Sequence, residues 1–290
     1  MMPQPLHLLA LGGAFFSAAA TIFIRQGLRG SDPYAGFFVN VVVGTISLWI
    51  AVIATGGLGH VSLKGALFFM SAGLIGTVGG RLLRFVAIEK VGASIAAALI
   101  NLNPFVASAL AIVLLGEHIT LPIVTGTVVI VIGTTLLSLG GTRLGFRPAQ
   151  LALPVLSAAC FGVVAVLRKL GLSDTSAITG SAINVTTALV GYTAFLLASG
   201  RPEVMVCRGR SLIHFVLAGL TENLGVFMNV VALSMGTVSV VTPLYGTAPI
   251  FVLLLAPLFL RDVETPSARV VAGTLLIVFG VYLITALTGR

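Results

Sequence analysis

Long runs of apolar residues, separated by short polar connectors, dominate the pattern along the chain. A membrane-spanning helix needs about 20 mainly apolar residues, and ten runs approach or exceed this length. The runs are residues 6–24, 37–55, 65–88, 93–115, 121–139, 151–172, 177–198, 211–234, 238–260 and 268–287. The connectors between them contain glycine, proline and charged residues, which are typical of turns. The pattern predicts an all-α integral membrane protein with ten transmembrane helices.

The composition excludes several classes of protein. Charged residues make up 8% of the 290 residues and hydrophobic residues 58%, whereas a soluble domain has roughly 25% charged residues. So few charges cannot form the surface of a soluble enzyme, a disordered protein or a nucleic-acid-binding module. The connectors are too short to hold catalytic machinery, and the cysteines and histidines show no metal-binding spacing. We therefore expect no enzymatic activity, no cofactor, no metal and no nucleic-acid partner.

The second half of the chain repeats motifs of the first half. The offset between matching residues stays between 144 and 147 positions. The matching pairs are Gly27 and Gly171, Gly36 and Gly180, Asn40 and Asn184, Ala72 and Ala218, Pro104 and Pro249, and Gly126 and Gly273. The repeat divides the chain into residues 1–140, a linker at 141–150, and residues 151–290. Because Asn40 and Asn184 recur in register, we interpret them as amides that tie helices together.

Each half contains five apolar runs, and five is an odd number. The second half must therefore enter the membrane from the side opposite to the first, which predicts two inverted five-helix repeats related by a pseudo-two-fold axis in the membrane plane. This symmetry is typical of secondary transporters that expose a central site to each side in turn. The alternative is a duplicated membrane scaffold that transports nothing.

Each half also ends with a run containing proline, an acidic residue at its exit, and two glycines seven residues apart. The motifs are Asn103-Pro104-Phe105, Glu117 and Gly126 with Gly133, then Ala248-Pro249-Ile250, Asp262 and Gly273 with Gly280. This arrangement resembles the EamA branch of the drug/metabolite transporter superfamily over essentially the whole chain. The second half departs from the family pattern, because Asp262, with Glu264 nearby, stands where the family usually has Gly-Glu.

The resemblance implies a ten-helix basket with a central cavity lined mainly by the third, fourth, eighth and ninth helices. It also implies export or exchange of small metabolites without ATP hydrolysis. The sequence agrees on the last point, because it contains no Gly-x-x-x-x-Gly-Lys-Ser/Thr phosphate-binding loop.

Three ionisable residues lie inside predicted membrane spans, where a charge costs about 2.5–3.5 kcal/mol on insertion scales. Glu222 is at the centre of the run 211–234, and Arg81 and Arg84 lie one turn apart on one face of the run 65–88. Since buried charges usually have partners, we expect Glu222 to face Arg81 or Arg84 across the cavity. The three residues form either a substrate clamp or coupling site, or a structural ion pair that locks the halves together.

Polar side chains also lie close to the repeated prolines. Asn101 and Asn103 precede or adjoin Pro104, and Tyr245 occupies the matching place before Pro249. Proline frees a backbone carbonyl, and such breaks are tolerated at membrane depth where the backbone lines a cavity. These three side chains are therefore candidates for hydrogen bonds to a substrate, or else for ties between helices.

Together these observations predict a secondary transporter, multi-pass and monomeric, in the inner (plasma) membrane. Its expected partners are the lipid bilayer, a small-molecule substrate, and a proton or counter-substrate. Amino acids or related zwitterions and anions fit best, because two arginines face one glutamate. One alternative is proton-coupled efflux of lipophilic cations, which needs Arg81 and Arg84 to point away from the cavity. Another is a non-transporting membrane subunit or a component of a lipid-carrier flippase.

The distribution of lysine and arginine bears on orientation. The odd-numbered connectors hold ten of these residues, and the even-numbered connectors and tails hold four: Lys64, Arg168, Lys169 and Arg290. The positive-inside rule then places both termini outside the cell. The resemblance implies the opposite orientation, with both termini in the cytoplasm.

Overall fold

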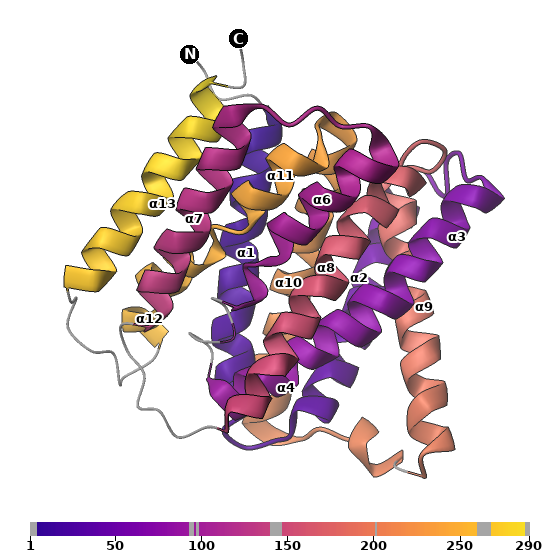
Figure 1. The fold of residues 1–290 in the computed structure, drawn as a ribbon. Helices are drawn as coiled ribbons and strands as arrows, with labels where there is room; N and C mark the ends of the chain where they lie inside the picture. The colour runs from indigo at the N-terminus through magenta and orange to yellow at the C-terminus, as the bar shows by residue number, and fades with distance from the viewer. Residues whose placement is uncertain are drawn as a thin grey trace.

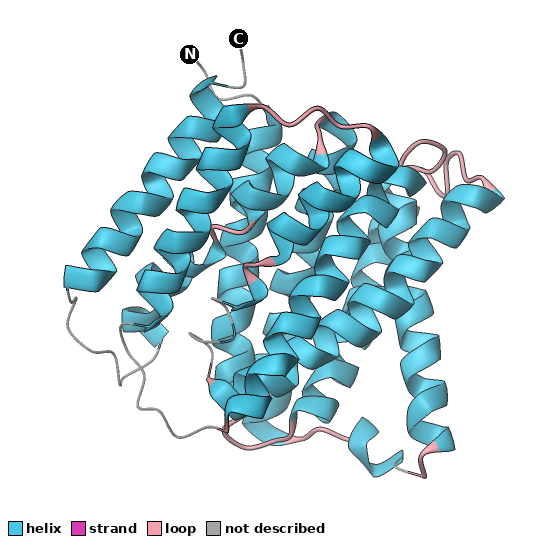
Figure 2. Ribbon diagram, viewed as in Figure 1, coloured by secondary structure: helices cyan, strands magenta, loops and turns pink. Residues whose placement is uncertain are grey.

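The computed structural model describes residues 5–92, 96, 99–139, 147–200, 202–259 and 268–287, and its named elements are all helical. They form a bundle of helices lying side by side (Figures 1 and 2). In the first half these are α1 (Pro5–Gly27), α2 (Pro33–Ala54), α3 (Leu63–Ala72), the π-helix η1 (Gly73–Arg81), α4 (Leu82–Val91), α6 (Asn103–Leu115) and α7 (Leu121–Leu139). In the second half they are η2 (Pro148–Leu151), α8 (Ala152–Gly171), α9 (Ala177–Ala198), η3 (Pro202–Met205), α10 (Gly209–Met235), α11 (Val238–Tyr245), α12 (Ala248–Phe259) and α13 (Ala268–Leu287).

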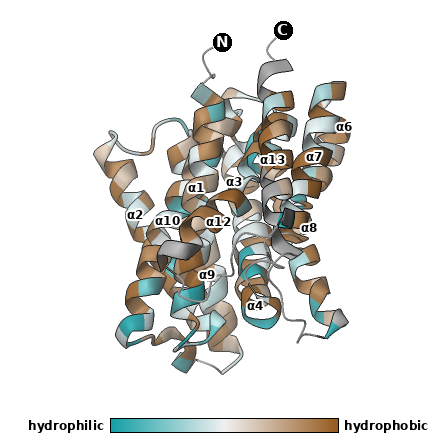
Figure 3. Ribbon diagram, turned by 90° about the vertical axis from the view of Figure 1, so that its left-hand side faces the viewer, coloured by the Kyte–Doolittle hydropathy of each residue, from teal (hydrophilic) through white to brown (hydrophobic). Residues whose placement is uncertain are grey.

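Seven helical segments of the described chain are long and apolar enough to cross a membrane. They are Pro5–Gly27, Pro33–Ala54, Leu63–Val91, Ala149–Gly171, Ala177–Ala198, Gly209–Met235 and Val238–Leu255, and Asn103–Leu115, Leu121–Leu136 and Leu275–Ile284 are shorter apolar helices. Hydrophobic residues cover much of the helices' length, and hydrophilic residues gather toward the ends (Figure 3). The all-helical membrane fold predicted from the sequence is confirmed. Parts of the predicted run 93–115 and of the linker 141–150 lie outside the described residues.

The predicted run 238–260 is not one continuous helix. Helix α11 ends at Tyr245, Gly246 and Thr247 form a turn, and α12 begins at Ala248, directly before Pro249. The first half has the same break, with a turn at Asn101-Leu102 before α6. Proline at the start of each new helix explains the position, because it favours the first helical turn and disrupts a helix interior.

The two halves pack through corresponding helices. Helix α1, the first of the first half, packs against α10, and its counterpart α8 packs against α3, η1 and α4. In addition, α2 contacts its counterpart α9, and α7 contacts its counterpart α13. At the α7–α13 contact a Cβ atom on Gly280 would lie 2.7 Å from the carbonyl oxygen of Gly126, and one on Gly133 would lie 2.7 Å from that of Gly273. The earlier glycine of one helix thus meets the later glycine of the other. These two helices, which occupy matching places in the repeat, run antiparallel (Figure 1).

Two phenylalanines related by the repeat fill notches that paired glycines form in the opposite half. Both rings are fully buried. Phe215 lies against Gly27 and Gly36, and Phe69 lies against Gly171 and Gly180. The recurrence of these glycines in the sequence therefore has a packing cause, since a side chain at any of them would occupy the space of a ring.

We expect Gly180→Ala to destabilise the protein by about 1–3 kcal/mol, because overpacking a close contact forces the Phe69 ring or the backbone to move. Gly79→Ala is the matched control, since the nearest atoms to its Cβ would be 3.7 Å away, an ordinary contact distance. The two variants are compared by the midpoints of their thermal unfolding in detergent. Equal midpoints for both would show that the notch is not tightly packed.

The π-helix η1 interrupts the predicted run 65–88. From Ala72 to Pro104 the first half spans 32 positions, whereas from Ala218 to Pro249 the second half spans 31. A π-helical turn holds one more residue than an α-helical turn, and such turns occur frequently at functional sites. The extra residue of the first half falls between Ala72 and Pro104, an interval that contains η1, whereas α10 continues without interruption.

Two of the four residues assigned to the even-numbered connectors and tails belong elsewhere. Arg168 and Lys169 lie in the last turn of α8. The Lys169 ammonium donates to the carbonyl oxygens of Leu233 and Gly236, both at 2.7 Å, at the end of α10. Arg168 points inward, as described below. Both residues lie at the end of the predicted run 151–172, where position alone does not reveal that Arg168 points inward.

Candidate functional site

A cavity of about 120 Å³ lies between the two halves. A single water needs roughly 10–15 Å³ of such space, so the cavity has room for a small organic molecule. All six residues singled out from the sequence line it: Arg81, Arg84, Asn101, Asn103, Glu222 and Tyr245. Side chains of α1 and α8, represented by Thr21 and Arg168, also line it. The first and sixth predicted spans therefore join the third, fourth, eighth and ninth in forming its wall.

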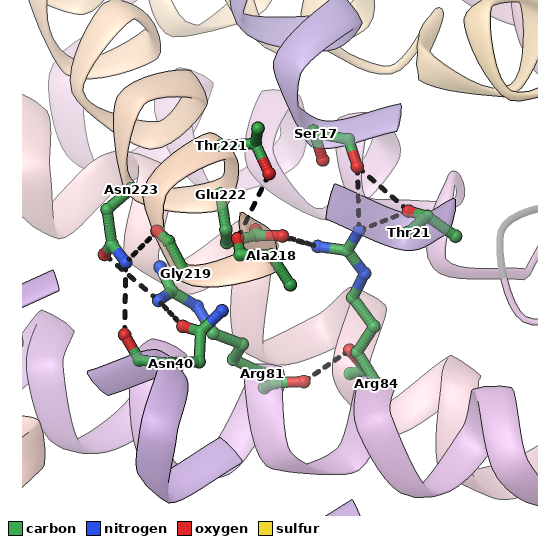
Figure 4. A network of polar contacts seen from close by, with 12 residues as sticks. Ser17, Thr21, Asn40, Arg81, Arg84, Ala218, Gly219, Thr221, Glu222 and Asn223 are labelled. Carbon is green, nitrogen blue, oxygen red and sulfur yellow. Dashed lines mark hydrogen bonds and ion pairs between the residues drawn. The ribbon is translucent and has the colours of Figure 1, made fainter. Parts of the chain in front are cut away.

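Glu222 on α10 forms a salt bridge with Arg84 on α4. Nη1 of Arg84 donates to both carboxylate oxygens of Glu222, at 2.8 and 2.7 Å, and the residues are 3% and 8% exposed. Nη2 of Arg84 donates to the hydroxyl of Thr21 at 2.5 Å and to the carbonyl of Ser17 at 3.2 Å, both on α1 (Figure 4). This buried pair joins the second half of the chain to two helices of the first half.

Arg81, the last residue of η1, is held by amides. Its Nη1 donates to Oδ1 of Asn40 at 2.9 Å and to Oδ1 of Asn223 at 3.2 Å (Figure 4). The residue is 3% exposed, and no carboxylate of the described chain forms a salt bridge with it. The direct hydrogen bonds of this guanidinium group therefore go to neutral amides.

Arg168 on α8 is also held by an asparagine, here one from its own half of the chain. Its Nε and Nη2 donate to Oδ1 of Asn184 at 3.2 and 2.9 Å. Sequence reasoning missed this cavity residue because it lies at the end of an apolar run. A usable signal was present: the position 144 residues earlier holds the apolar Ile24, so an arginine here breaks the repeat.

The supporting amides follow the repeat, whereas the charges do not. Asn223 donates to the backbone carbonyl of Asn40 at 3.3 Å, and at the corresponding place Asn184 donates to the hydroxyl of Thr77 at 2.8 Å. Asn40 and Asn184 thus each link a second-position helix to the other half and accept from an arginine. The repeat position of Glu222, in contrast, is Gly76 in the first half. The charged side chains make an asymmetric site inside a nearly symmetric frame.

The two helix breaks meet at the cavity. Nδ2 of Asn101 donates to the hydroxyl of Thr134 at 2.7 Å, while its Oδ1 lies so close to Gly246 that a Cβ there would collide with it. Asn103 donates to the carbonyl of Ile100 at 3.0 Å. The ring of Tyr245 rests against α1, where a Cβ on Gly13 would lie 3.1 Å from it. Asn101 and Asn103 are therefore partly engaged by the protein, and all three line the space where a solute would sit.

A carboxylate from the first half caps a helix of the second half. Glu117 follows α6 and accepts from the backbone N–H groups of Val238 and Ser239, at 2.8 and 3.1 Å, and from the Ser239 hydroxyl at 2.6 Å. These are the first donors of α11, which a negative charge stabilises. The matching acid, Asp262, lies outside the described residues.

Comparison with known proteins fits this geometry. The sequence model of the EamA-like transporter family matches residues 4–139 and again residues 149–286. The chain belongs to the EamA-like transporter family. Its fold is similar to that of a chain in a solved crystal structure, with 18% sequence identity, a TM-score of 0.78 and coverage of 98% of each chain. No match is found among curated proteins.

The resemblance to the EamA branch is thus confirmed, with two copies of the family's repeat covering the chain. Proteins of this family are membrane transporters of the drug/metabolite transporter superfamily. The chain is accordingly a multi-pass membrane protein whose central cavity lies at the junction of the two copies.

Proposed function

We propose that the protein is a monomeric secondary transporter with ten transmembrane helices in two inverted repeats, located in the inner (plasma) membrane. It exports or exchanges small organic metabolites, among which amino acids and related zwitterions or anions fit best, by alternating access. The antiparallel course of α7 and α13 and the matching contacts of the two halves support the inverted arrangement. A proton or counter-substrate supplies the driving force, because the sequence lacks an ATP-binding loop.

The observation that carries this proposal is the charge of the cavity. Three arginines and one glutamate line it, in an environment where water is scarce and electrostatic interactions are strong. Guanidinium groups bind carboxylates well, because their N–H donors match the geometry of two oxygens. Efflux of lipophilic cations fits less well, because it requires Arg81 and Arg84 to point away from the cavity, and both line it.

The contacts between the halves suggest how access alternates. Glu222 with Arg84, and Arg81 with Asn223, join the halves beside the cavity, while Glu117 joins them where α11 begins. When one half rocks against the other, these contacts must rearrange, and a solute that competes for Arg81 or Arg84 lowers the cost of that step. In this mechanism Glu222 and Arg84 couple solute binding to movement.

Reconstitution of the purified chain in liposomes tests the proposal. We expect vesicles loaded with unlabelled amino acids and carboxylates to take up a labelled solute of one of these classes without ATP. A lipophilic cationic dye should not exchange. Uptake of the dye alone would support efflux of cations, and no movement of any solute by a folded protein would support a subunit that transports nothing by itself.

A further inference from the structure

Two of the three cavity arginines, Arg81 and Arg168, keep an entire terminal NH2 group without a hydrogen-bond acceptor in the described chain. A guanidinium group has five N–H bonds. Arg81 directs only Nη1 to Asn40 and Asn223, and Arg168 directs only Nε and Nη2 to Asn184. Within the described chain, Nη2 of Arg81 and Nη1 of Arg168 have no acceptor, and both residues line the cavity. The amides fix the position of each guanidinium and leave one edge of it available.

Glu222 makes no direct contact with either of these two guanidinium groups in the described chain. Both of its carboxylate oxygens accept from Nη1 of Arg84, and no salt bridge joins it to Arg81 or Arg168. The Glu222–Arg84 pair is neutral as a unit, so the cavity keeps an excess of two positive charges. An unneutralised charge inside a membrane is costly, and a bound solute with two negative charges removes the cost of both.

From this arrangement we infer that the solute is a small organic dianion held by Arg81 and Arg168 together, an inference that rests on the proposed transport function. Arg81 comes from the first half and Arg168 from the second, so such a solute bridges the two repeats. A zwitterionic amino acid matches less well, because its ammonium group finds the Glu222 carboxylate already occupied by Arg84. Dicarboxylates and phosphate monoesters share the required chemistry.

Three probes of matched length isolate the second negative charge: succinate, its half-amide succinamate, and butyrate. We expect succinate to stabilise the purified wild-type protein against thermal unfolding and to drive exchange in liposomes at roughly tenfold or more lower concentration than succinamate. Glycerol 3-phosphate tests the alternative that the solute is a phosphate monoester rather than a dicarboxylate. A stronger effect of glycerol 3-phosphate than of succinate would indicate that the solute carries both negative charges on one phosphate group. A weaker effect would indicate that it carries them on two carboxylate groups.

Variants of Arg81 and Arg168 test whether these two residues bind the two negative charges of the solute. Arg81→Gln and Arg168→Gln should each lose the preference for succinate over succinamate, while Arg81→Lys and Arg168→Lys retain part of it. Arg25→Gln, which removes an exposed arginine at the end of α1, should leave the preference unchanged. If the glutamine variants do not fold, the comparison of succinate with succinamate on the wild-type protein still tests whether the solute is a dianion.

Equal effects of succinate, succinamate and glycerol 3-phosphate on a protein that transports them would overturn the dianion inference and leave the proposed function intact. Retention of the full preference by both glutamine variants would overturn the assignment to Arg81 and Arg168. A folded protein that moves no carboxylate, phosphate ester or amino acid would overturn the proposed function itself.

Discussion

Glu222→Gln is expected to abolish transport and to destabilise the protein by about 3–5 kcal/mol, because it leaves the buried Arg84 guanidinium without its partner. The carboxylate and the guanidinium are 2.7 Å apart and almost fully buried. Glutamine keeps the shape of the side chain, so any change reports the loss of charge. Thermal unfolding in detergent and exchange in liposomes measure the two effects separately.

Two further variants show whether the effect of Glu222→Gln comes from the buried pair and whether that pair is needed for transport. Glu89→Gln removes a carboxylate from the exposed pair that Glu89 forms with Lys90, and it should leave both stability and transport unchanged, because exposed pairs contribute little. The double variant Glu222→Gln/Arg84→Gln should recover most of the stability, since no unpaired charge remains, but not transport. Recovery of transport together with stability would instead make the pair purely structural.

Insertion of one alanine after Gly79, within the π-helix η1, is expected to abolish transport. Each α-helical residue turns the chain by about 100°, so the added residue would rotate Arg81 and Arg84 away from the cavity relative to α3. The Glu222 carboxylate would then lose its partner, and the protein should be at least as unstable as Glu222→Gln. Stability and exchange assays again provide the readouts.

Gly57 supplies the position of the matched control for this insertion. It lies in the exposed connector after α2 with nothing within 4 Å of its Cβ position, and connectors tolerate changes of length. Insertion of one alanine after Gly57 should therefore leave transport in place. Wild-type transport by the variant with the insertion after Gly79 would show that the number of residues in η1 does not set the direction of the arginines.

Much of the fold could be predicted from the sequence because its causes are local or repeated. Apolar runs gave the predicted helices, and 121–139, 177–198 and 268–287 coincide with α7, α9 and α13. The repeated glycines marked the places where helices approach closely. Glu222 and Arg84 stood out because charges are rare in such runs, and the need for a partner brought them together correctly.

Other features depend on contacts that one sequence does not reveal. The changing offset of the repeat shows one extra residue between Ala72 and Pro104, but it does not predict that Gly73–Arg81 forms a π-helix. Arg168 lies near a helix end, where an arginine reaches either outward or inward, and only the position of Asn184 on α9 decides. The capping of α11 by Glu117 joins residues 121 positions apart, and no local pattern in the sequence predicts that contact.

Accessibility of one cavity position from the two sides of the membrane tests the central claim most directly. In a protein with Cys160 and Cys207 replaced by serine, Val226→Cys places a single thiol on the cavity wall. Thr55→Cys after α2 and Ser199→Cys after α9 mark the two membrane faces. We expect a small, membrane-impermeant thiol reagent to modify Val226→Cys from either side of sealed vesicles, and each marker from one side only. Modification of Val226→Cys from a single side, in a protein that binds its solute, would contradict alternating access.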